Sequence, residues 1–175
     1  MQLLKTFETE RLILKPTSAD DAALILELLN TPKWKEFIGD RNVNNILEAA
    51  AYIMNKLVPQ IEKLGFGNYT IIRKADGEKI GSCGLSSREG FEGVDIGFAL
   101  LPAFENMGYA FEAAHKLKEA AFEEFHLSEI SGITVKNNIA SRHLLKKLGL
   151  KFEKVIEFPN ATEEVHLYKL SQGNA

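Results

Sequence analysis

The sequence contains one cysteine, Cys83, among its 175 residues. A lone cysteine cannot form an internal disulfide, so the composition is typical of a reducing compartment. No apolar run approaches the roughly 18 residues that a membrane-spanning helix needs, and the apolar stretch near the N-terminus is too short for a signal peptide. We therefore expect a cytoplasmic protein with no membrane partner.

Basic charge is also scarce, because 21 lysines and arginines stand against 24 aspartates and glutamates. No run of lysines and arginines is interleaved with aromatic residues, so we expect no nucleic acid partner. Glu112 and His115 have the spacing of a carboxylate-bridged iron pair, but such a site needs a second pair that the chain lacks. The four histidines are otherwise scattered, and we expect no metal.

The chain does have enough apolar material for one core. Hydrophobic residues make up 45% of its 175 residues, which suffices for one well-buried domain and is little for two. No internal repeat or low-complexity segment interrupts it. We expect a single domain over residues 1–175, present as a monomer or a homodimer.

The first third of the chain predicts one strand followed by helices. Apolar alternation indicates a strand over residues 11–15, and the segment SADD at 18–21 is typical of a capping box that begins a helix. The Thr31-Pro32 pair ends this helix and begins another.

A longer amphipathic helix follows. It begins at Asn44 or Asn45, carries its apolar residues on one face, and ends at Gly65. Pro59 lies within it and lacks the N–H that the helical hydrogen-bond ladder needs, so we expect a kink there.

The rest of the chain alternates between strands and helices. Asp76-Gly77 is a strong hairpin signal, and residues 86–93 form a polar loop. One later helix reaches Phe125, and we expect Glu112 and Lys116 to pair on its solvent-exposed face. Another helix spans 138–149. The predicted strands are residues 68–73, 79–85, 94–100, 130–135, 152–158 and 164–170, the last two joined around Asn160. This order predicts a mixed α/β sheet with helices on both faces.

The most informative segment joins the strand at 94–100 to the next helix through Glu105-Asn106-Met107-Gly108. The first N–H groups of a helix lack internal partners and carry the positive end of its dipole, so they can donate to a phosphate. Gly108 lets a ligand approach the backbone closely. The same joint also occurs in α/β proteins where it binds nothing, so both interpretations stay open on this segment alone.

Four further motifs accompany this loop. They are TERLIL at 9–14, DIGF at 95–98, NIAS at 138–141 and KLGL at 147–150. Together the motifs resemble the GNAT superfamily of acetyl-CoA-dependent N-acetyltransferases, most closely the RimJ/RimL type that acetylates N-terminal amines of ribosomal proteins. The resemblance runs from Phe7 to Leu170. It implies a single α+β domain with a mixed, mostly antiparallel sheet flanked by helices, acetyl-CoA as cosubstrate and an amine as acceptor.

The resemblance also implies a cofactor site. In this family the acetyl-CoA diphosphate lies on a loop of the form Arg/Gln-x-x-Gly-x-Gly/Ala, which aligns with residues 105–110. Glu105 and Asn106 depart from that form. Asparagine tolerates positive φ, and we expect the Glu105 carboxylate to point outward because opposing a diphosphate costs free energy. The implied cofactor contacts are Phe98, Leu100, Met107, Gly108, Tyr109, Ala110 and Asn138, although Asn138 is equally well interpreted as a plain helix N-cap.

Two catalytic roles follow from the same resemblance. Asp95 aligns with an acidic residue, most often glutamate, that serves as general base, and its shorter side chain favours action through a water molecule. Alternatively, Asp95 is only the polar residue of an alternating strand. Many relatives place a tyrosine acid where this chain has Leu145, which leaves Ser141 as proton donor to the thiolate or, alternatively, as a hydroxyl associated with the helix cap.

The acceptor class is predicted from the free energy of deprotonation. An α-amine loses its proton at pH 7 for roughly 1.4 kcal/mol, whereas a lysine costs about 4.6 kcal/mol. We therefore expect an N-terminal α-amine of a protein such as a ribosomal protein. A small-molecule amine, or a non-catalytic acyl-CoA-binding protein of the same fold, are the alternatives. Trp34, Phe37 and Ser87 are candidate acceptor contacts, and Trp34 and Phe37 are otherwise core residues.

Overall fold

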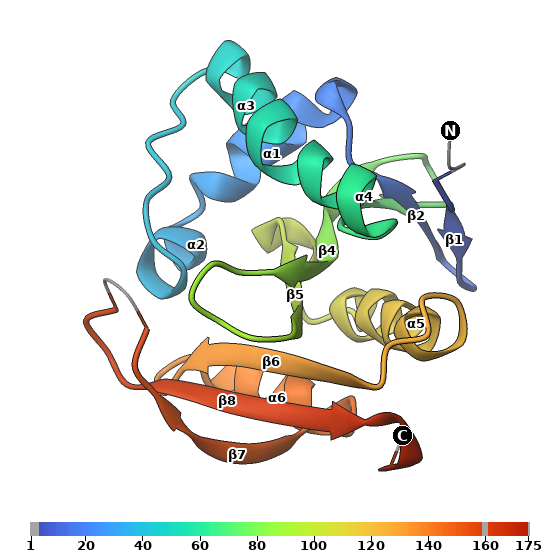
Figure 1. The fold of residues 1–175 in the computed structure, drawn as a ribbon. Coiled ribbons are helices and arrows are strands. Elements are labelled where there is room, and N and C mark those ends of the chain that lie inside the picture. The colour runs from blue at the N-terminus through green and yellow to red at the C-terminus, as the bar shows by residue number, and fades with distance from the viewer. Residues whose placement is uncertain (1–3, 159–160, 175) are drawn as a thin grey trace.

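The computed structural model describes residues 4–158 and 161–174, which build an eight-stranded sheet in the order β1-β2-β3-β4-β5-β6-β8-β7 (Figure 1). Neighbouring strands are antiparallel except β5 and β6, which run parallel. The predicted mixed, mostly antiparallel sheet is therefore confirmed. The strands are β1 (Phe7–Glu8), β2 (Leu12–Pro16), β3 (Asn68–Arg73), β4 (Lys79–Ser87), β5 (Val94–Leu100), β6 (Glu129–Val135), β7 (Lys151–Ile156) and β8 (Val165–Ser171).

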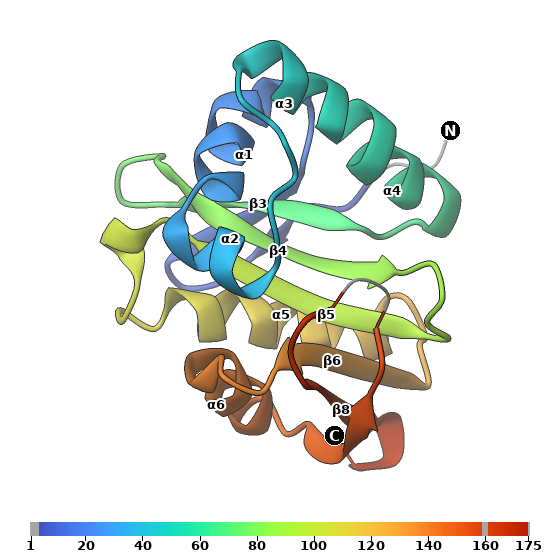
Figure 2. The same cartoon turned by 90° about the vertical axis from the view of Figure 1, so that its left-hand side faces the viewer.

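Helices cover both faces of the sheet. The first four lie on one face, and α5 packs against the other (Figure 2). None of the described helices is long and apolar enough to cross a bilayer. The helices are α1 (Ala22–Leu29), α2 (Pro32–Phe37), α3 (Ile46–Tyr52), α4 (Val58–Leu64), α5 (Tyr109–Glu123) and α6 (Ile139–Lys147), with short turns η1 (Ala19–Asp21), η2 (Ile53–Leu57), η3 (Pro102–Phe104) and η4 (Gln172–Asn174).

The predicted helix starts are confirmed by their caps. Thr31 accepts a hydrogen bond from the Trp34 N–H at the start of α2, and Pro32 occupies its first turn. Of the two candidates for the start of α3, Asn45 is the cap, because its side chain accepts from the Glu48 N–H at 2.9 Å. Polar side chains thus satisfy donors that the helices themselves leave open.

The long helix is interrupted where the sequence predicts a kink. Between α3 and α4 the chain widens into the π-helical turn η2, and Pro59 lies in the first turn of α4. Proline cannot donate to the carbonyl four residues earlier, and a π-turn accommodates that missing bond. Gly65 ends α4 at φ +80°, a left-handed conformation that glycine adopts without steric cost.

One buried core joins the two faces of β2 to β5 with α1 and α5. Aromatic rings pack together at one end of this core. The ring centroids of Phe7 and Tyr69 are 5.6 Å apart, and those of Phe66 and Phe125 are 5.1 Å apart. Cys83 is buried there, in agreement with an inert core thiol.

Several boundaries differ from the predicted ones. The two-residue strand β1 is not predicted at all, and β4 continues through Ser87, so the polar loop begins at Arg88. The later helix ends at Lys147, and β7 ends at Ile156. The turn expected around Asn160 lies outside the described residues.

Candidate functional site

The sheet is open at one place, between the parallel strands β5 and β6. The two strands share a single pair in register, Asp95 with Ser131, and diverge toward their C-terminal ends. Residues Gly97 to Leu100 are therefore only half-buried although β5 lies in the middle of the sheet. In α/β sheets ligands bind in such crevices at the carboxyl ends of strands. We call this unpaired region between the two strands the cleft. The helix α5 follows β5 in the chain, and α6 follows β6.

The loop before α5 has the backbone geometry of an anion site. Asn106 and Gly108 both adopt left-handed conformations, with φ of +61° and +83°. The turn thus accommodates asparagine at position 106 in a left-handed conformation. Gly108 is the N-cap of α5 and has no side chain to occupy the first amides of the helix. The N–H groups that follow Met107 are available to an acceptor from outside.

Glu105, the acidic residue that departs from the expected form of this loop, is paired with a cation. Its carboxylate lies 2.6 Å from the Lys33 ammonium on α2. The carboxylate is therefore directed toward α2, and the neighbouring positive charge compensates it.

Asp95 is the buried carboxylate of the cleft. Its side chain is 1% exposed and accepts a hydrogen bond from the Arg88 Nε at 2.9 Å. Burial raises the pKa of Asp95, and the Arg88 guanidinium offsets only part of that rise. Gly97 lies two residues along the same face of β5, and a Cβ there would meet nothing within 4 Å. Open space therefore lies two residues along the strand from a buried carboxylate whose pKa is raised.

Asn138 and Ser141 lie together at the start of α6. The Asn138 side chain accepts from the Ser141 N–H at 3.2 Å, so the N-cap interpretation of Asn138 is confirmed. This bond uses the amide oxygen and leaves its NH2 group for another partner. Leu145 is 1% exposed and packs against Gly132, where an added Cβ would lie 2.4 Å from it. Leu145 is a core residue here.

The predicted acceptor contacts have different environments. Trp34 packs against the core, and its buried indole Nε1 has no hydrogen-bond partner among the described residues. It lines a cavity of about 30 Å³ together with Asn68 and Ser82. Phe37 is half-buried. Ser87 exchanges backbone hydrogen bonds with the Gln60 side chain, at 3.1 and 3.2 Å.

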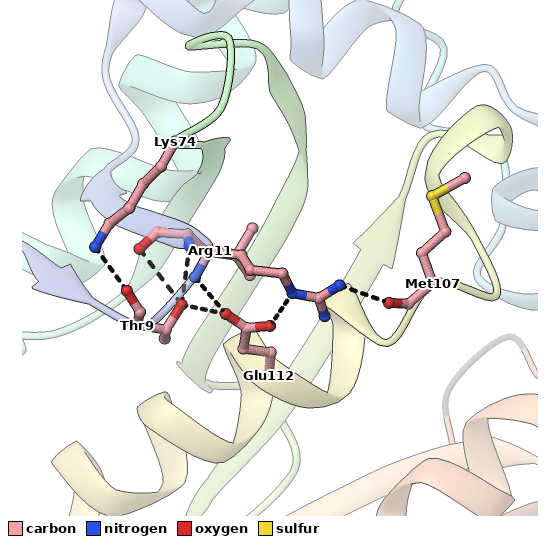
Figure 3. Close-up of polar contacts among 6 residues, drawn as sticks. Thr9, Arg11, Lys74, Met107 and Glu112 are labelled. Atoms are coloured by element: carbon pink, nitrogen blue, oxygen red, sulfur yellow. Dashed lines mark hydrogen bonds and ion pairs between the residues drawn. The ribbon is translucent and has the colours of Figure 1, made fainter.

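A polar network beside the loop was not predicted. Glu112 faces the N-terminal segment, where it accepts from the Thr9 hydroxyl at 2.6 Å and from the Arg11 N–H and Nε at 2.9 and 2.6 Å (Figure 3). The expected pair of Glu112 with Lys116 is wrong, because these stronger partners come from residues about a hundred positions away in the chain. Within residues 4–158 and 161–174 no cluster of histidine, cysteine, aspartate or glutamate could hold a metal ion.

Comparison with known proteins identifies the fold and the chemistry together. The acetyltransferase (GNAT) domain family matches residues 11–151. This chain belongs to the GNAT acetyltransferase family. It is 29% identical to the uncharacterized N-acetyltransferase YoaA of Bacillus subtilis over 150 residues, which are 85% of this chain and 84% of YoaA.

Solved GNAT structures superpose along nearly the full chain. An acetyltransferase from Agrobacterium tumefaciens has a TM-score of 0.82 at 23% identity and covers 98% of this chain and 97% of its own. The structure titled RimL, a ribosomal L7/L12 alpha-N-protein acetyltransferase in complex with coenzyme A, has a TM-score of 0.81 at 14% identity, with coverage of 95% and 98%. These TM-scores show that the fold is shared. As a GNAT member, the protein is an N-acetyltransferase that uses acetyl-CoA and an amine acceptor.

Proposed function

We propose that the protein transfers the acetyl group of acetyl-CoA to an N-terminal α-amine of a protein, such as a ribosomal protein. The observation that carries this proposal is the unpaired region between the parallel strands β5 and β6, where β5 carries a buried carboxylate, Asp95, and open space at Gly97. The RimJ/RimL-like motifs and the titles of two structural neighbours, a ribosomal-protein-S5-alanine acetyltransferase and RimL, support a ribosomal-protein acceptor.

The loop residues fit a diphosphate. We assign the backbone amides from Met107 to Ala110 as its donors, because the left-handed Gly108 opens the start of α5 and the helix dipole favours negative charge there. Phe98 and Leu100, half-buried near the C-terminal end of β5, are proposed to line the rest of the cofactor site, and the Asn138 amide NH2 is proposed as a further donor from α6. No cofactor contact requires a metal in this proposal.

Asp95 is proposed as the general base. A carboxylate whose pKa is raised by burial accepts a proton better than a solvated one, and the acceptor needs to lose only one proton before it attacks the thioester. The open space at Gly97 admits a water molecule that relays the proton. An α-amine costs roughly 1.4 kcal/mol to deprotonate at pH 7, so a modest base suffices.

Ser141 is proposed as the proton donor to the departing thiolate sulfur. Its backbone is fixed by the Asn138 cap, and its hydroxyl is free to rotate toward the cleft. On the acceptor side, Phe37 and Ser87 remain proposed contacts. Trp34 is proposed to support that wall from inside the core rather than to touch the acceptor directly.

A small-molecule amine that carries a carboxylate, such as a free amino acid, is the second candidate acceptor. Arg88 uses its Nε for Asp95, and its 39% exposed side chain places a solvent-accessible positive charge beside that carboxylate. A free amino acid could place its carboxylate on that guanidinium and its amine near Asp95.

One acetylation assay separates these acceptors. Release of coenzyme A would be followed with three acceptors: a peptide with a free N-terminus, the same peptide with a blocked N-terminus and a lysine, and free amino acids. The proposal expects turnover with the first peptide alone. Turnover with amino acids alone would favour the small-molecule function. If none is acetylated although acetyl-CoA binds, both proposed acceptor classes are wrong.

A further inference from the structure

Arg11 connects the N-terminal segment to the start of α5. Its backbone N–H and its Nε donate to the two carboxylate oxygens of Glu112, at 2.9 and 2.6 Å. The Thr9 hydroxyl donates to the same carboxylate at 2.6 Å, and the Lys74 ammonium donates to the Thr9 carbonyl at 2.6 Å. The guanidinium is therefore held on one side by a fixed carboxylate (Figure 3).

The Glu112 carboxylate stays ionised in this network. Burial raises its pKa, but the hydrogen bonds from Thr9 and Arg11, together with the charge of Arg11, outweigh burial and lower the pKa. A charged carboxylate at neutral pH keeps the bidentate contact with Arg11 in one geometry.

The other side of the Arg11 guanidinium contacts the loop before α5 and the first residue of that helix. Nη1 donates to the Met107 carbonyl at 3.0 Å, and the guanidinium carbon lies 4.3 Å from the centre of the Tyr109 ring. Between them, a Cβ on Gly108 would lie 3.2 Å from Nη2. Arg11 thus contacts Met107 in the loop and Tyr109 at the start of α5, and Gly108 between them has a φ of +83°, which favours glycine.

Fixing the Met107 carbonyl also fixes the direction of the next amide. In a planar trans peptide the C=O and N–H groups point in opposite directions. Because the Met107 carbonyl points toward Arg11, the Gly108 N–H points away from it, on the side where an acceptor can reach the start of α5.

Charge alone does not explain this arrangement. Arg11 is paired with Glu112, Lys33 with Glu105, and Arg73, which lies over the Phe104 ring, with Asp76, so each of these three cations already has a carboxylate partner. The attraction for a diphosphate then depends mainly on how the backbone amides are aimed.

We propose that Arg11 is a positioning residue for the acetyl-CoA diphosphate. It holds the Met107 carbonyl so that the amides at the start of α5 converge on the phosphate oxygens, with Glu112 orienting the guanidinium. This inference rests on the proposed cofactor site and adds to it a residue from the opposite end of the chain.

The test is calorimetric binding of coenzyme A to the wild type and to Arg11→Gln, Arg11→Lys and Glu112→Gln. We expect a Kd about tenfold or more higher for Arg11→Gln, since a charge-assisted hydrogen bond is worth about 1.5–3 kcal/mol. Arg11→Lys should recover little of this loss, because an ammonium keeps the charge but cannot bridge Glu112 and Met107 with a planar fork. Glu112→Gln should weaken binding less.

Lys5→Gln is the matched control. Lys5 makes an ion pair with Glu124 at the far end of α5, so this substitution also removes a link from the N-terminal segment to the same helix. It should leave the Kd within about twofold of the wild type. With a free amine that the wild type acetylates as acceptor, Arg11→Gln should raise KM for acetyl-CoA while kcat stays within about twofold, which a general loss of structure would not produce.

The outcomes are distinct. A wild type that does not bind coenzyme A would refute the proposed cofactor site itself. If the wild type binds but a folded Arg11→Gln variant binds equally well, or if Arg11→Lys restores full affinity, the positioning role is wrong. An equal loss in Lys5→Gln, or a fall in kcat without a rise in KM, would assign Arg11 to general stability and also overturn the inference.

Discussion

At the scale of single residues, the buried carboxylate of Asp95 is expected to lower the free energy of unfolding. Asp95 is buried and has a raised pKa, so the folded protein favours its protonated form. Its ionised form at neutral pH is therefore less favourable in the fold than in the unfolded chain. Such a cost is expected where a carboxylate is needed for chemistry.

Asp95→Asn should lower kcat/KM by about a hundredfold or more, because it removes the general base while preserving shape. The rates of both proteins should rise with pH as the acceptor amine loses its proton, and only the wild type should show an additional rise through the raised pKa of Asp95. Initial rates between pH 5 and 8 would measure both. A variant that retains the wild-type rate and pH profile would exclude Asp95 as the base.

The same variant should be more stable than the wild type at neutral pH. Because the folded pKa of Asp95 is raised, the stability associated with its protonated form is fully present at low pH and is lost as pH rises through the folded pKa. Asn cannot ionise and keeps that stability. Urea unfolding at pH 7 should show a higher midpoint for Asp95→Asn, and the difference should shrink toward pH 4. Equal midpoints at both values would contradict the direction of the pKa shift.

Glu105→Gln tests whether the negative charge in the loop weakens acetyl-CoA binding. The Lys33 pair that it breaks has a 60% exposed lysine, so unfolding free energy should change by less than about 1 kcal/mol. Affinity for acetyl-CoA should increase, because a negative charge near the diphosphate is removed and Lys33 loses its competing partner. Calorimetric titration at low salt measures the change. Weaker binding would show that the Lys33 pair holds the loop in its binding conformation.

At the scale of elements, the start of α6 allows the capping role of Asn138 to be separated from its proposed role in binding the cofactor. The Asn138 oxygen caps the helix, whereas its NH2 group is the proposed cofactor donor. Aspartate keeps a capping oxygen and alanine does not.

Asn138→Ala should therefore cost about 1 kcal/mol of unfolding free energy, and Asn138→Asp much less. Both should raise KM for acetyl-CoA, since both lack the donor. Thermal unfolding and steady-state kinetics on the pair of variants give the two readouts. If Asn138→Asp keeps the wild-type KM, Asn138 is a cap and nothing more.

The elements also show what sequence reasoning can reach. Periodicity and turn residues predicted α1, α5 and the hairpin of β3 and β4, because hydrophobic burial and turn chemistry act locally. The single register pair between β5 and β6 has no local signature. The contact of Arg11 with Glu112 joins residues separated by 101 positions, so the helical spacing of Glu112 and Lys116 predicted a different partner. Asp95 was identified as a candidate, but its burial with Arg88 depends on how two strands and a loop meet.

At the scale of the whole molecule, binding should stabilise the fold. Acetyl-CoA at a hundred times its Kd adds about 2.7 kcal/mol, which for a chain of this size raises Tm by roughly 5 to 10 °C. Thermal unfolding with and without acetyl-CoA would measure this shift, with an adenosine fragment as control. No shift at saturating acetyl-CoA would remove the basis for the cofactor site.

The cleft also divides the molecule. Strands β1 to β5 form one antiparallel set and β6, β8 and β7 form another, and among the described residues one Cα pair in register joins them. Because few backbone hydrogen bonds cross this boundary, each set can open without the other. Native-state hydrogen exchange should therefore resolve two cooperative blocks with different opening free energies, and the reaction would take place at the seam where they meet.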